Sequence, residues 1–354
     1  MFERASERAQ IRKHREANGI DVGCRHAGEI EKGKCVRKTI VECKRTEESF
    51  KVSLADCEKR CKYKEPAGKG RISVVIPIID EDPKEVATTL RTIKDGTKGD
   101  VEMILIDDSS KIPLDYATFR TKGRMGATRA RQLGCERATG EFVAVLDSHM
   151  KIGKGNLREL ARVAEKTGGI AYCGCNSHIV CEMRNVGELP LAKWSKPGRF
   201  QLQPTTSMMG ACYVMQRSVL EFMGGWVGLP GYLGWQELSQ TINAWKHGIP
   251  ITCHTGISNW HHFRLTASAP VPYDRYILNR AAMHRMLFGD ECWNEVWKPR
   301  LLKPPKNVRR IPALLMKEAE APWILEYGEK LRSNMVKSDE DFMEYFATLK
   351  KQDK

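Results

Sequence analysis

Acidic and histidine side chains gather in two short segments whose composition suits metal chemistry. Asp147-Ser148-His149 follows one apolar run, and Asp107-Asp108 follows another. Because one intervening residue can turn away, Asp147 and His149 can face the same cation. A carboxylate oxygen with an imidazole nitrogen suits a borderline ion such as Mn²⁺ better than a strictly oxygen-loving one. One Asp after a strand is as often a turn residue or a helix cap, but two successive cases favour a site.

A further histidine downstream could complete this metal site. The segment Asn259–Arg264 contains two adjacent histidines after an expected strand at residues 249–253. A lone histidine is more often structural than a ligand. Here His261 could join Asp147 and His149 around one cation.

Glu237 is the candidate base. It opens an expected helix that runs to about His247, after the turn Gly234-Trp235. A carboxylate there either interacts favourably with the helix dipole or acts as a buried base, and its spacing favours neither. Between these groups, Gly210-Ala211 forms a small-residue turn that enters an apolar strand.

Alternating strands and helices must position these groups. The continuous apolar run Ile72–Ile79 is typical of a strand buried on both faces. Apolar residues at helical spacing predict helices at Lys84–Lys94, Ala127–Ala138 and Leu157–Glu165, and further strands are expected at 101–106, 142–146 and about 170–172. This order predicts an α/β domain with a mostly parallel sheet, whose ligands bind beyond the carboxyl ends of the strands.

Composition limits the classes of protein that the chain can belong to. The 354 residues include 41% hydrophobic residues and carry a net charge of +14. The first figure is too high for a wholly disordered chain. The chain has no apolar run near the ~20 residues that a membrane span needs, and no secretory signal, so we expect a soluble cytoplasmic protein. The charge is consistent with a polyanionic partner or with a solvated basic surface.

Three zones are expected: a Cys-rich basic subdomain at 1–70, the α/β domain at 71–300, and a basic linker with a helical tail at 301–354. Mixed Cys and His at short spacing in the first zone predicts a structural Zn²⁺ site. Its candidate ligands are Cys24, His26, Cys35, Cys43, Cys57 and Cys61. The alternative is scattered free thiols. The later cysteines, including Cys173, Cys175 and Cys181, are interpreted as ordinary buried thiols.

The tail contains a basic tract between Lys298 and Lys317, interrupted by prolines. This tract could contact nucleic acid phosphates, form a strap near an anionic ligand, or be a solvated loop. The stretch Trp323–Leu349 is typical of amphipathic helices that pack on the domain or on another subunit.

Taken together, the motifs resemble GT-A fold nucleotide-sugar glycosyltransferases, of the family-2 type and the polypeptide N-acetylgalactosaminyltransferases. The resemblance spans roughly Arg71 to Arg300. It rests on the order and spacing of six segments. These are Ser73-Val-Val-Ile-Pro77, Ile106-Asp-Asp-Ser109, Arg124-Met-Gly-Ala-Thr-Arg129-Ala-Arg131, Thr139-Gly-Glu-Phe142, Leu146-Asp-Ser-His149 and Trp260-His-His-Phe-Arg264.

This resemblance implies a Rossmann-like GT-A domain that binds a UDP-sugar. It implies that Asp107 or Asp108 contacts the uracil or ribose, and that Arg124 lies along the nucleotide. Asp147, His149 and His261 would hold Mn²⁺ or Mg²⁺ against the diphosphate. Gly210 and Ala211 belong to a loop around Thr205–Cys212 that, with Gly224–Glu237, would select the donor sugar.

One departure from the family concerns the reaction type. The helix entry reads Leu233-Gly-Trp-Gln-Glu237, and Glu237 falls where inverting family-2-type enzymes place an Asp base. The expected function is therefore inverting transfer of a sugar to a hydroxyl on a protein or glycan, without a membrane partner. The alternatives are the same chemistry on a hydroxylated base in DNA, such as a 5-hydroxymethyl base, and a non-catalytic carbohydrate-binding protein.

Overall fold

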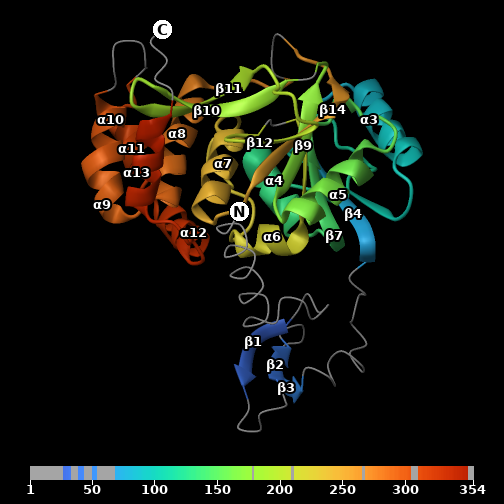
Figure 1. Ribbon diagram of the computed structural model, residues 1–354, viewed down its shortest axis with the longest axis horizontal. Coiled ribbons are helices and arrows are strands. Elements are labelled where there is room, and N and C mark those ends of the chain that lie inside the picture. The colour runs from blue at the N-terminus through green and yellow to red at the C-terminus, as the bar shows by residue number, and fades with distance from the viewer. Residues whose placement is uncertain are drawn as a thin grey trace.

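The computed structural model describes residues 27–32, 39–43, 50–53, 68–177, 179–208, 211–264, 268–303 and 310–349. Most of these residues build one large sheet with helices packed on it and beside it (Figure 1). Within the described ranges, no helix is long and apolar enough to cross a membrane.

The large sheet is mixed and mostly parallel. Its strands follow the order β12–β14–β9–β13–β7–β4–β5–β6, and β8 pairs with β14. Strands β7, β4, β5 and β6 run parallel, as do β14 and β9, whereas β13 is antiparallel to both of its neighbours. The bounds are β4 Gly68–Ile78, β5 Val101–Asp107, β6 Phe119–Arg120, β7 Gly140–Leu146, β8 Met150–Lys151, β9 Ile170–Cys175, β12 Leu202–Thr205, β13 Cys212–Gln216 and β14 Ile251–His261. The predicted α/β class is confirmed.

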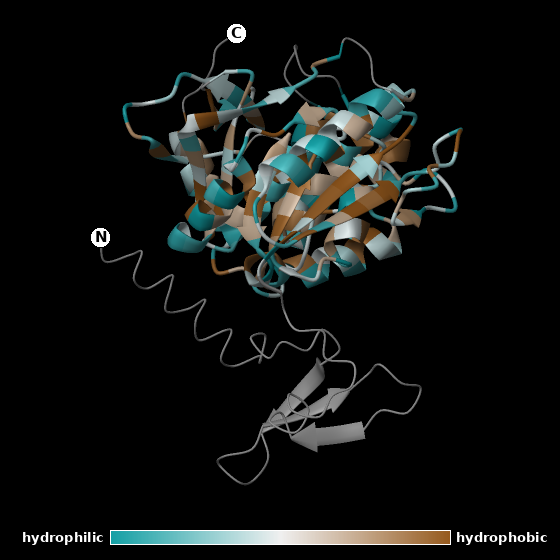
Figure 2. Ribbon diagram, turned by 90° about the vertical axis from the view of Figure 1, so that its right-hand side faces the viewer, coloured by the Kyte–Doolittle hydropathy of each residue, from teal (hydrophilic) through white to brown (hydrophobic). Residues whose placement is uncertain are grey.

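Three helices follow the first strands at the predicted places. They are α3 (Pro83–Gly96), α4 (Ala127–Cys135) and α5 (Asn156–Thr167). Helix α4 packs on β4 and β5, where Gly134 lies so close to Val75 that a Cβ atom would overlap it. Figure 2 shows hydrophobic residues concentrated in the central strands, with many hydrophilic residues on the helices around them. The predicted buried strand is confirmed, because Ile72, Val74 and Val75 are fully buried.

Strand β14 is longer than expected. The prediction ended it at Cys253, but it continues to His261, and its register against β9 shifts between His254 and Ser258. The polar residues at this irregularity hide the second half of the strand from a hydrophobic pattern. His261 is therefore the last residue of a strand rather than part of a loop after it.

The described part of the N-terminal zone is a three-stranded antiparallel sheet of β1 (Ala27–Lys32), β2 (Thr39–Cys43) and β3 (Phe50–Ser53). The expected zinc ligands are not placed by the structure. Cys24, His26, Cys35, Cys57 and Cys61 lie outside the described residues, and only the backbone of Cys43 is described. The zinc site stays a prediction. Another short hairpin, of β10 (Val180–Val186) and β11 (Leu189–Ser195), lies apart from the large sheet's ladder.

Of the helices after β13, α6 (Arg217–Phe222) packs on β7 and β13, and the others surround a second apolar cluster. The others are α7 Gln236–Lys246, α8 Tyr273–Leu287, α9 Asp290–Cys292, the π-helix η1 Trp293–Trp297, α10 Lys298–Leu302, α11 Ala313–Glu318, α12 Pro322–Arg332 and α13 Asp339–Thr348. This cluster joins Leu278, Trp293 and Trp297 to Phe342 and Phe346. The predicted tail helices thus share a core with residues before 300, and the predicted zone boundaries stay predictions.

The described cysteines of the α/β domain are buried thiols, as predicted for Cys173, Cys175 and Cys181. Burial raises the pKa of the Cys181 thiol to about 11 and that of Cys175 to about 12. A thiol with such a pKa is almost entirely protonated at neutral pH and therefore unreactive.

We expect the Asp339→Ala variant to be less stable by about 3 kcal/mol, because it leaves the buried ammonium of Lys246 without its carboxylate. Lys246 ends α7, and its Nζ atom contacts Asp339 at the start of α13 and donates to the backbone oxygen of Leu287 at 3.1 Å. Urea unfolding measures the change. The exposed Asp341→Ala variant removes only a capping box and should cost about 1 kcal/mol. Equal losses in the two variants would contradict this prediction.

Candidate active site

The candidate residues meet at the carboxyl edge of the sheet. Asp107 ends β5, Asp147 directly follows β7, and His261 ends β14. His261 pairs with Met150 of β8, so the two segments that carry the histidines lie side by side. The sheet thereby brings together residues that are more than a hundred positions apart in the chain.

Asp147, His149 and His261 form a compact group of potential metal ligands. One ligand atom from each lies within 4.8 Å of the others. The Nε2 atom of His261 is 3.2 Å from Oδ2 of Asp147, and the two imidazole centroids are 4.8 Å apart. These three are the residues for which the sequence predicted a shared cation.

Helix α3 fixes the loop that carries His149. The buried hydroxyl of Thr89 accepts a hydrogen bond from the backbone N–H of Met150 at 2.9 Å. The same hydroxyl lies 2.7 Å from the backbone oxygen of Ser148. The loop is therefore held on both sides of His149 by one side chain.

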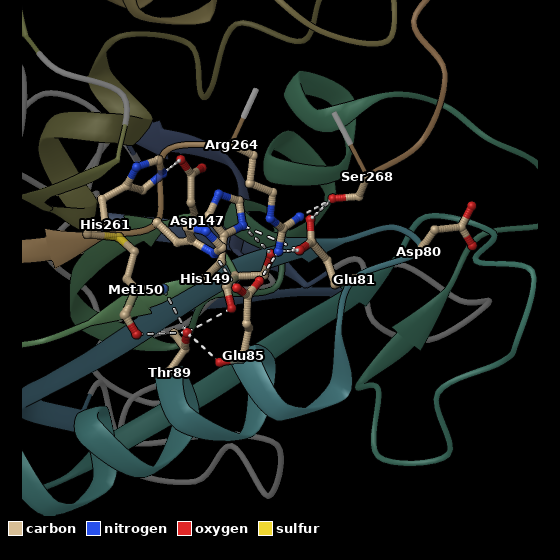
Figure 3. A network of polar contacts seen from close by, with 12 residues as sticks. Asp80, Glu81, Glu85, Thr89, Asp147, His149, Met150, His261, Arg264 and Ser268 are labelled. Carbon is tan, nitrogen blue, oxygen red and sulfur yellow. Dashed lines mark hydrogen bonds and ion pairs between the residues drawn. The ribbon is translucent and has the colours of Figure 1, made fainter. Parts of the chain in front are cut away.

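A second polar group, centred on Glu81, contacts His149 (Figure 3). Oε2 of Glu81 lies 3.3 Å from Nδ1 of His149 and 2.6 Å from the Arg264 guanidinium. Its Oε1 accepts from the Ser268 hydroxyl at 2.8 Å. Burial alone would raise the pKa of Glu81, but its contacts with His149 and Arg264 lower it. Oε2 of the ionised Glu81 faces Nδ1 of His149, so Nε2 of that imidazole is the nitrogen left for a cation.

Arg131 of α4 supports Asp147. Its side chain is 1% exposed and its Nη2 atom donates to Oδ1 of Asp147. Burial alone would raise the pKa of Asp147, but the Arg131 charge and the hydrogen bond from His261 lower it. Asp147 therefore stays ionised, as a metal ligand requires.

The group fits a divalent cation chemically. It offers one carboxylate and two imidazoles, which is the mixed oxygen and nitrogen set that Mn²⁺ accepts. Oδ2 of Asp147 and Nε2 of His261 face each other, and Nδ1 of His261 is buried without a hydrogen-bond partner. The His149 imidazole is oriented by Glu81 in the way that metal-bound histidines are oriented by carboxylates.

A cavity of about 330 Å³ lies on one side of this group. Asp108, Arg124, Arg131 and Gln236 line it, together with Asp147, His149 and His261. Both carboxylate oxygens of Asp108 accept backbone N–H bonds at 2.8 Å, from Met125 and Gly126. Asp108 thus links the end of β5 to the start of α4 at the wall of the cavity.

The two strand-end aspartates differ in position. Asp107 is fully buried and does not line the cavity. Its Oδ1 accepts from the backbone of Ser110 at 2.8 Å, and its Oδ2 contacts Arg120. Burial alone would raise the pKa of Asp107, but these contacts lower it. Asp107 therefore holds its own loop in place. This is the role of a turn residue, which the sequence analysis gave as the alternative to a binding role.

The three arginines of the 124–131 segment also differ in their position relative to the cavity. The Arg124 guanidinium lies 4.2 Å from the Tyr232 ring centroid and donates to the backbone oxygen of Pro270 at the rim of the cavity. Arg129 points elsewhere, with its guanidinium 4.7 Å from the Trp323 ring centroid. Only Arg124 and Arg131 of the three line the cavity.

A second cavity, of about 260 Å³, lies on the other side of Asp147 and His261. It contains Glu237 and is otherwise lined mainly by apolar side chains. These are Cys181, Ala192, Trp194, Met208, Ala211 and Phe263. Asp147, His261 and Phe263 line both cavities, so they separate the two spaces. Ala211 belongs to the second cavity, and Gly210 lies outside the described residues.

Glu237 enters the second cavity from the start of α7. Trp235 has a left-handed backbone with φ of 66°, which is costly for a bulky residue and sets the direction of the helix start. Gln236 donates to Oε1 of Glu237 at 2.8 Å. Burial raises the pKa of Glu237, although the nearby Arg131 charge opposes this shift. A raised pKa is typical of a carboxylate that serves as a base near neutral pH.

Sequence reasoning missed four contributors to the site: Glu81, Thr89, Gln236 and Asn176, whose side chain forms hydrogen bonds with the backbone of His261. Glu81 lies shortly after a buried strand, as Asp147 does, and that shared position could have identified it. Gln236 precedes the candidate base. Thr89 and Asn176 look like an ordinary helix residue and an ordinary turn residue, so no signal in the sequence marks them.

Comparisons with known proteins show what this chain is similar to. Residues 73–224 match the model of Glycosyl transferase family 2. Probable N-acetylgalactosaminyltransferase 6 of Caenorhabditis elegans is 26% identical over 282 residues, which cover 70% of this chain and 44% of that protein. Polypeptide N-acetylgalactosaminyltransferase 10 of Mus musculus is 35% identical over 92 residues, which are 22% of this chain and 15% of that protein. The chain spans less than half the length of these curated relatives.

A solved structure shares the fold. The crystal structure of GalNAc-T7 with UDP, GalNAc and Mn²⁺ superposes with a TM-score of 0.58 at 15% sequence identity. The match covers 78% of this chain and 57% of that one. This superposition shows that the chain has the same fold as that glycosyltransferase, the GT-A fold. Residues 73–224 are thus similar to glycosyl transferase family 2, and the chain has distant similarity to the polypeptide N-acetylgalactosaminyltransferases.

Proposed function

We propose that the chain transfers a sugar from a UDP-sugar to a hydroxyl group of a protein or glycan, with inversion at the sugar carbon. The observation that carries this proposal is the position of Asp147 and His261 between two cavities. One cavity carries Asp108, Arg124 and Arg131 among its lining residues, which suits a nucleotide, and the other contains a buried carboxylate. A solved relative of the same fold holds UDP, GalNAc and Mn²⁺, which supports the choice of donor and cation.

The first cavity is assigned to the nucleotide. Asp108 lies at its wall and Arg124 at its rim, where a nucleotide offers hydroxyl donors and an anionic diphosphate. Of the two strand-end aspartates only Asp108 lines this cavity, so we assign the donor contact to Asp108. Arg131 adds a buried positive charge beside Asp147.

Asp147, His149 and His261 would hold a divalent cation where the diphosphate enters from the first cavity. When bound, this cation stabilises the negative charge that develops on the departing UDP. Mn²⁺ is the proposed ion and Mg²⁺ the alternative. Arg131 keeps Asp147 ionised and oriented, and Glu81 orients the His149 imidazole.

Glu237 is proposed as the general base of a single displacement. Its carboxylate takes the proton of the acceptor hydroxyl in the second cavity, and the acceptor oxygen forms a bond to C1 of the sugar. The bond between C1 and the diphosphate oxygen breaks at the same time, and UDP leaves with the electron pair. Because attack and departure occur on opposite faces of C1, the configuration inverts.

We expect an α-linked UDP-sugar to yield a β-linked product. Proton NMR of the anomeric coupling in the isolated product measures this directly. An α-linked product would contradict the inverting mechanism and the role of Glu237 as base, while leaving the assignment of the donor cavity intact.

The proposed function as a whole is tested by a donor screen. Released nucleotide is measured with UDP-, GDP- and TDP-sugars, with and without Mn²⁺, in the presence of peptide, oligosaccharide or hydroxymethylated DNA acceptors. We expect release from a UDP-sugar that needs the cation and is accelerated by a peptide or oligosaccharide. Sugar incorporated into DNA alone would replace the proposed acceptor class, and binding of oligosaccharide without turnover of any donor would reject the enzyme.

A further inference from the structure

Strand β9 ends two residues too early to support His261. It runs parallel to β14, and its last paired residue, Cys175, lies opposite Asn259. The ladder therefore stops two residues before the histidine that ends β14. A ligand at such an unsupported strand end would be free to shift by more than a metal site tolerates.

The side chain of Asn176 continues the ladder beyond this point. Its Oδ1 accepts from the backbone N–H of His261 at 2.7 Å, and its Nδ2 donates to the backbone oxygen of His261 at 2.8 Å. Its own backbone N–H donates to the oxygen of Asn259 at 2.8 Å. One amide side chain thus makes both hydrogen bonds that a neighbouring strand would make with His261.

The residue type follows from this arrangement. Asn176 has φ of 58°, in the left-handed region that asparagine tolerates better than most residues. This backbone turn takes the main chain away from β14 and leaves the side chain in its place. A carboxamide offers a donor and an acceptor side by side, whereas a carboxylate offers only acceptors.

The opposite edge of the same segment is held independently. The backbone N–H of His262 donates to the oxygen of His149 at 3.1 Å, and His261 pairs with Met150 of β8. His261 is therefore fixed between β8 on one edge and Asn176 on the other. Both contacts act on the backbone, so they set the position from which the imidazole reaches toward Asp147.

We propose that Asn176 is a positioning residue that places His261 for cation binding. The inference rests on the metal site assigned under the proposed function. Asn176 does not touch the cation or the substrate. It determines where the Nε2 atom of His261 lies relative to Asp147, at the 3.2 Å separation seen here.

A purely structural turn residue would behave differently. The Asn176→Gly variant accepts the left-handed backbone without strain and removes both side-chain hydrogen bonds to His261. The Asn176→Asp variant keeps the shape and the acceptor but places an oxygen against the His261 carbonyl. If Asn176 only made the turn, both variants would at most lower the melting temperature and would leave cation affinity unchanged.

Titration with Mn²⁺ alone, followed by the electron paramagnetic resonance signal of the free ion, tests the proposal without any turnover. We expect the Kd for Mn²⁺ to rise about 10-fold or more in Asn176→Gly and Asn176→Asp, the range seen when a residue that orients a ligand is lost. The control is Glu188→Gly. Glu188 also has positive φ, of 60°, at the turn between β10 and β11, and it lines neither cavity.

Circular dichroism and thermal unfolding of each variant accompany the titration, so that affinity is compared between folded proteins. Wild-type affinity in Asn176→Gly would overturn the inference, because that variant lacks both hydrogen bonds to His261. Failure of the wild-type protein to bind Mn²⁺ would instead reject the metal site itself. The two outcomes are distinguished by the wild-type titration.

Discussion

The Asp147→Asn variant should lose roughly 10³-fold in kcat. The cation stabilises the charge on the leaving group by several kcal/mol, and each 1.36 kcal/mol of lost stabilisation slows the reaction tenfold. The same variant should lose Mn²⁺ affinity in a titration without donor. Asn has nearly the shape of Asp, so the cavity stays filled and the Arg131 contact keeps an acceptor. The lost property is the ionised oxygen that faces His261.

A stability cost accompanies this change. Arg131 is buried and loses the carboxylate that compensates its charge, so we expect the variant to unfold about 2 kcal/mol more easily. Asp100→Asn is the matched control, since Asp100 pairs with Arg71 at an exposed position outside both cavities. Wild-type turnover in Asp147→Asn, or in wild-type protein treated with EDTA, would contradict the cation's role.

The Glu237→Gln variant should lower kcat by roughly 10²–10⁴-fold, the contribution of a positioned general base. Donor binding should be unchanged, because Glu237 lines only the second cavity. Isothermal titration with UDP and Mn²⁺ measures binding, and initial rates measure kcat. A parallel loss of donor affinity would show that Glu237 acts on the donor and not on the acceptor.

The pH dependence of the wild-type enzyme provides an independent check on Glu237. Burial raises its pKa above the ordinary value of 4.5. A base works when deprotonated, so kcat should fall as the pH is lowered through this raised pKa, and Glu237→Gln should lack this acidic limb. Burial disfavours the ionised form of Glu237. At pH values above its raised pKa, the Glu237→Gln variant should therefore be as stable as the wild type or more stable. A variant that retains the acidic limb would assign it to another group.

The strand-end residues could be predicted because buried strands and their polar ends are visible in a hydrophobic pattern. The position after β7 identified Asp147, and the short spacing to His149 added the second ligand. His261 was found through its motif, although the strand that carries it was predicted to end eight residues earlier, at Cys253. The irregular polar half of β14 carries no alternation from which its true end could be inferred.

The supporting residues could not be predicted, for a geometric reason. Glu81 reaches His149, and Asn176 reaches His261, across separate segments of the chain. Such contacts depend on where side chains point after the sheet has formed. The same holds for Asp107 and Asp108, neighbours with the same chemistry, of which one is turned into its own loop and the other toward the cavity.

Helix α7 connects the second cavity to the C-terminal helices, two parts of the molecule that an experimenter would otherwise treat as separable. Glu237 lies in its first turn, and Lys246 at its last residue is bound to the start of α13. Shortening the chain to its family-matched segment would remove α7 altogether, and trimming only the last helices would free its far end. Deletion mapping of this protein should therefore begin after residue 349, and affinity tags at the C-terminus are safer than truncations before Asp339.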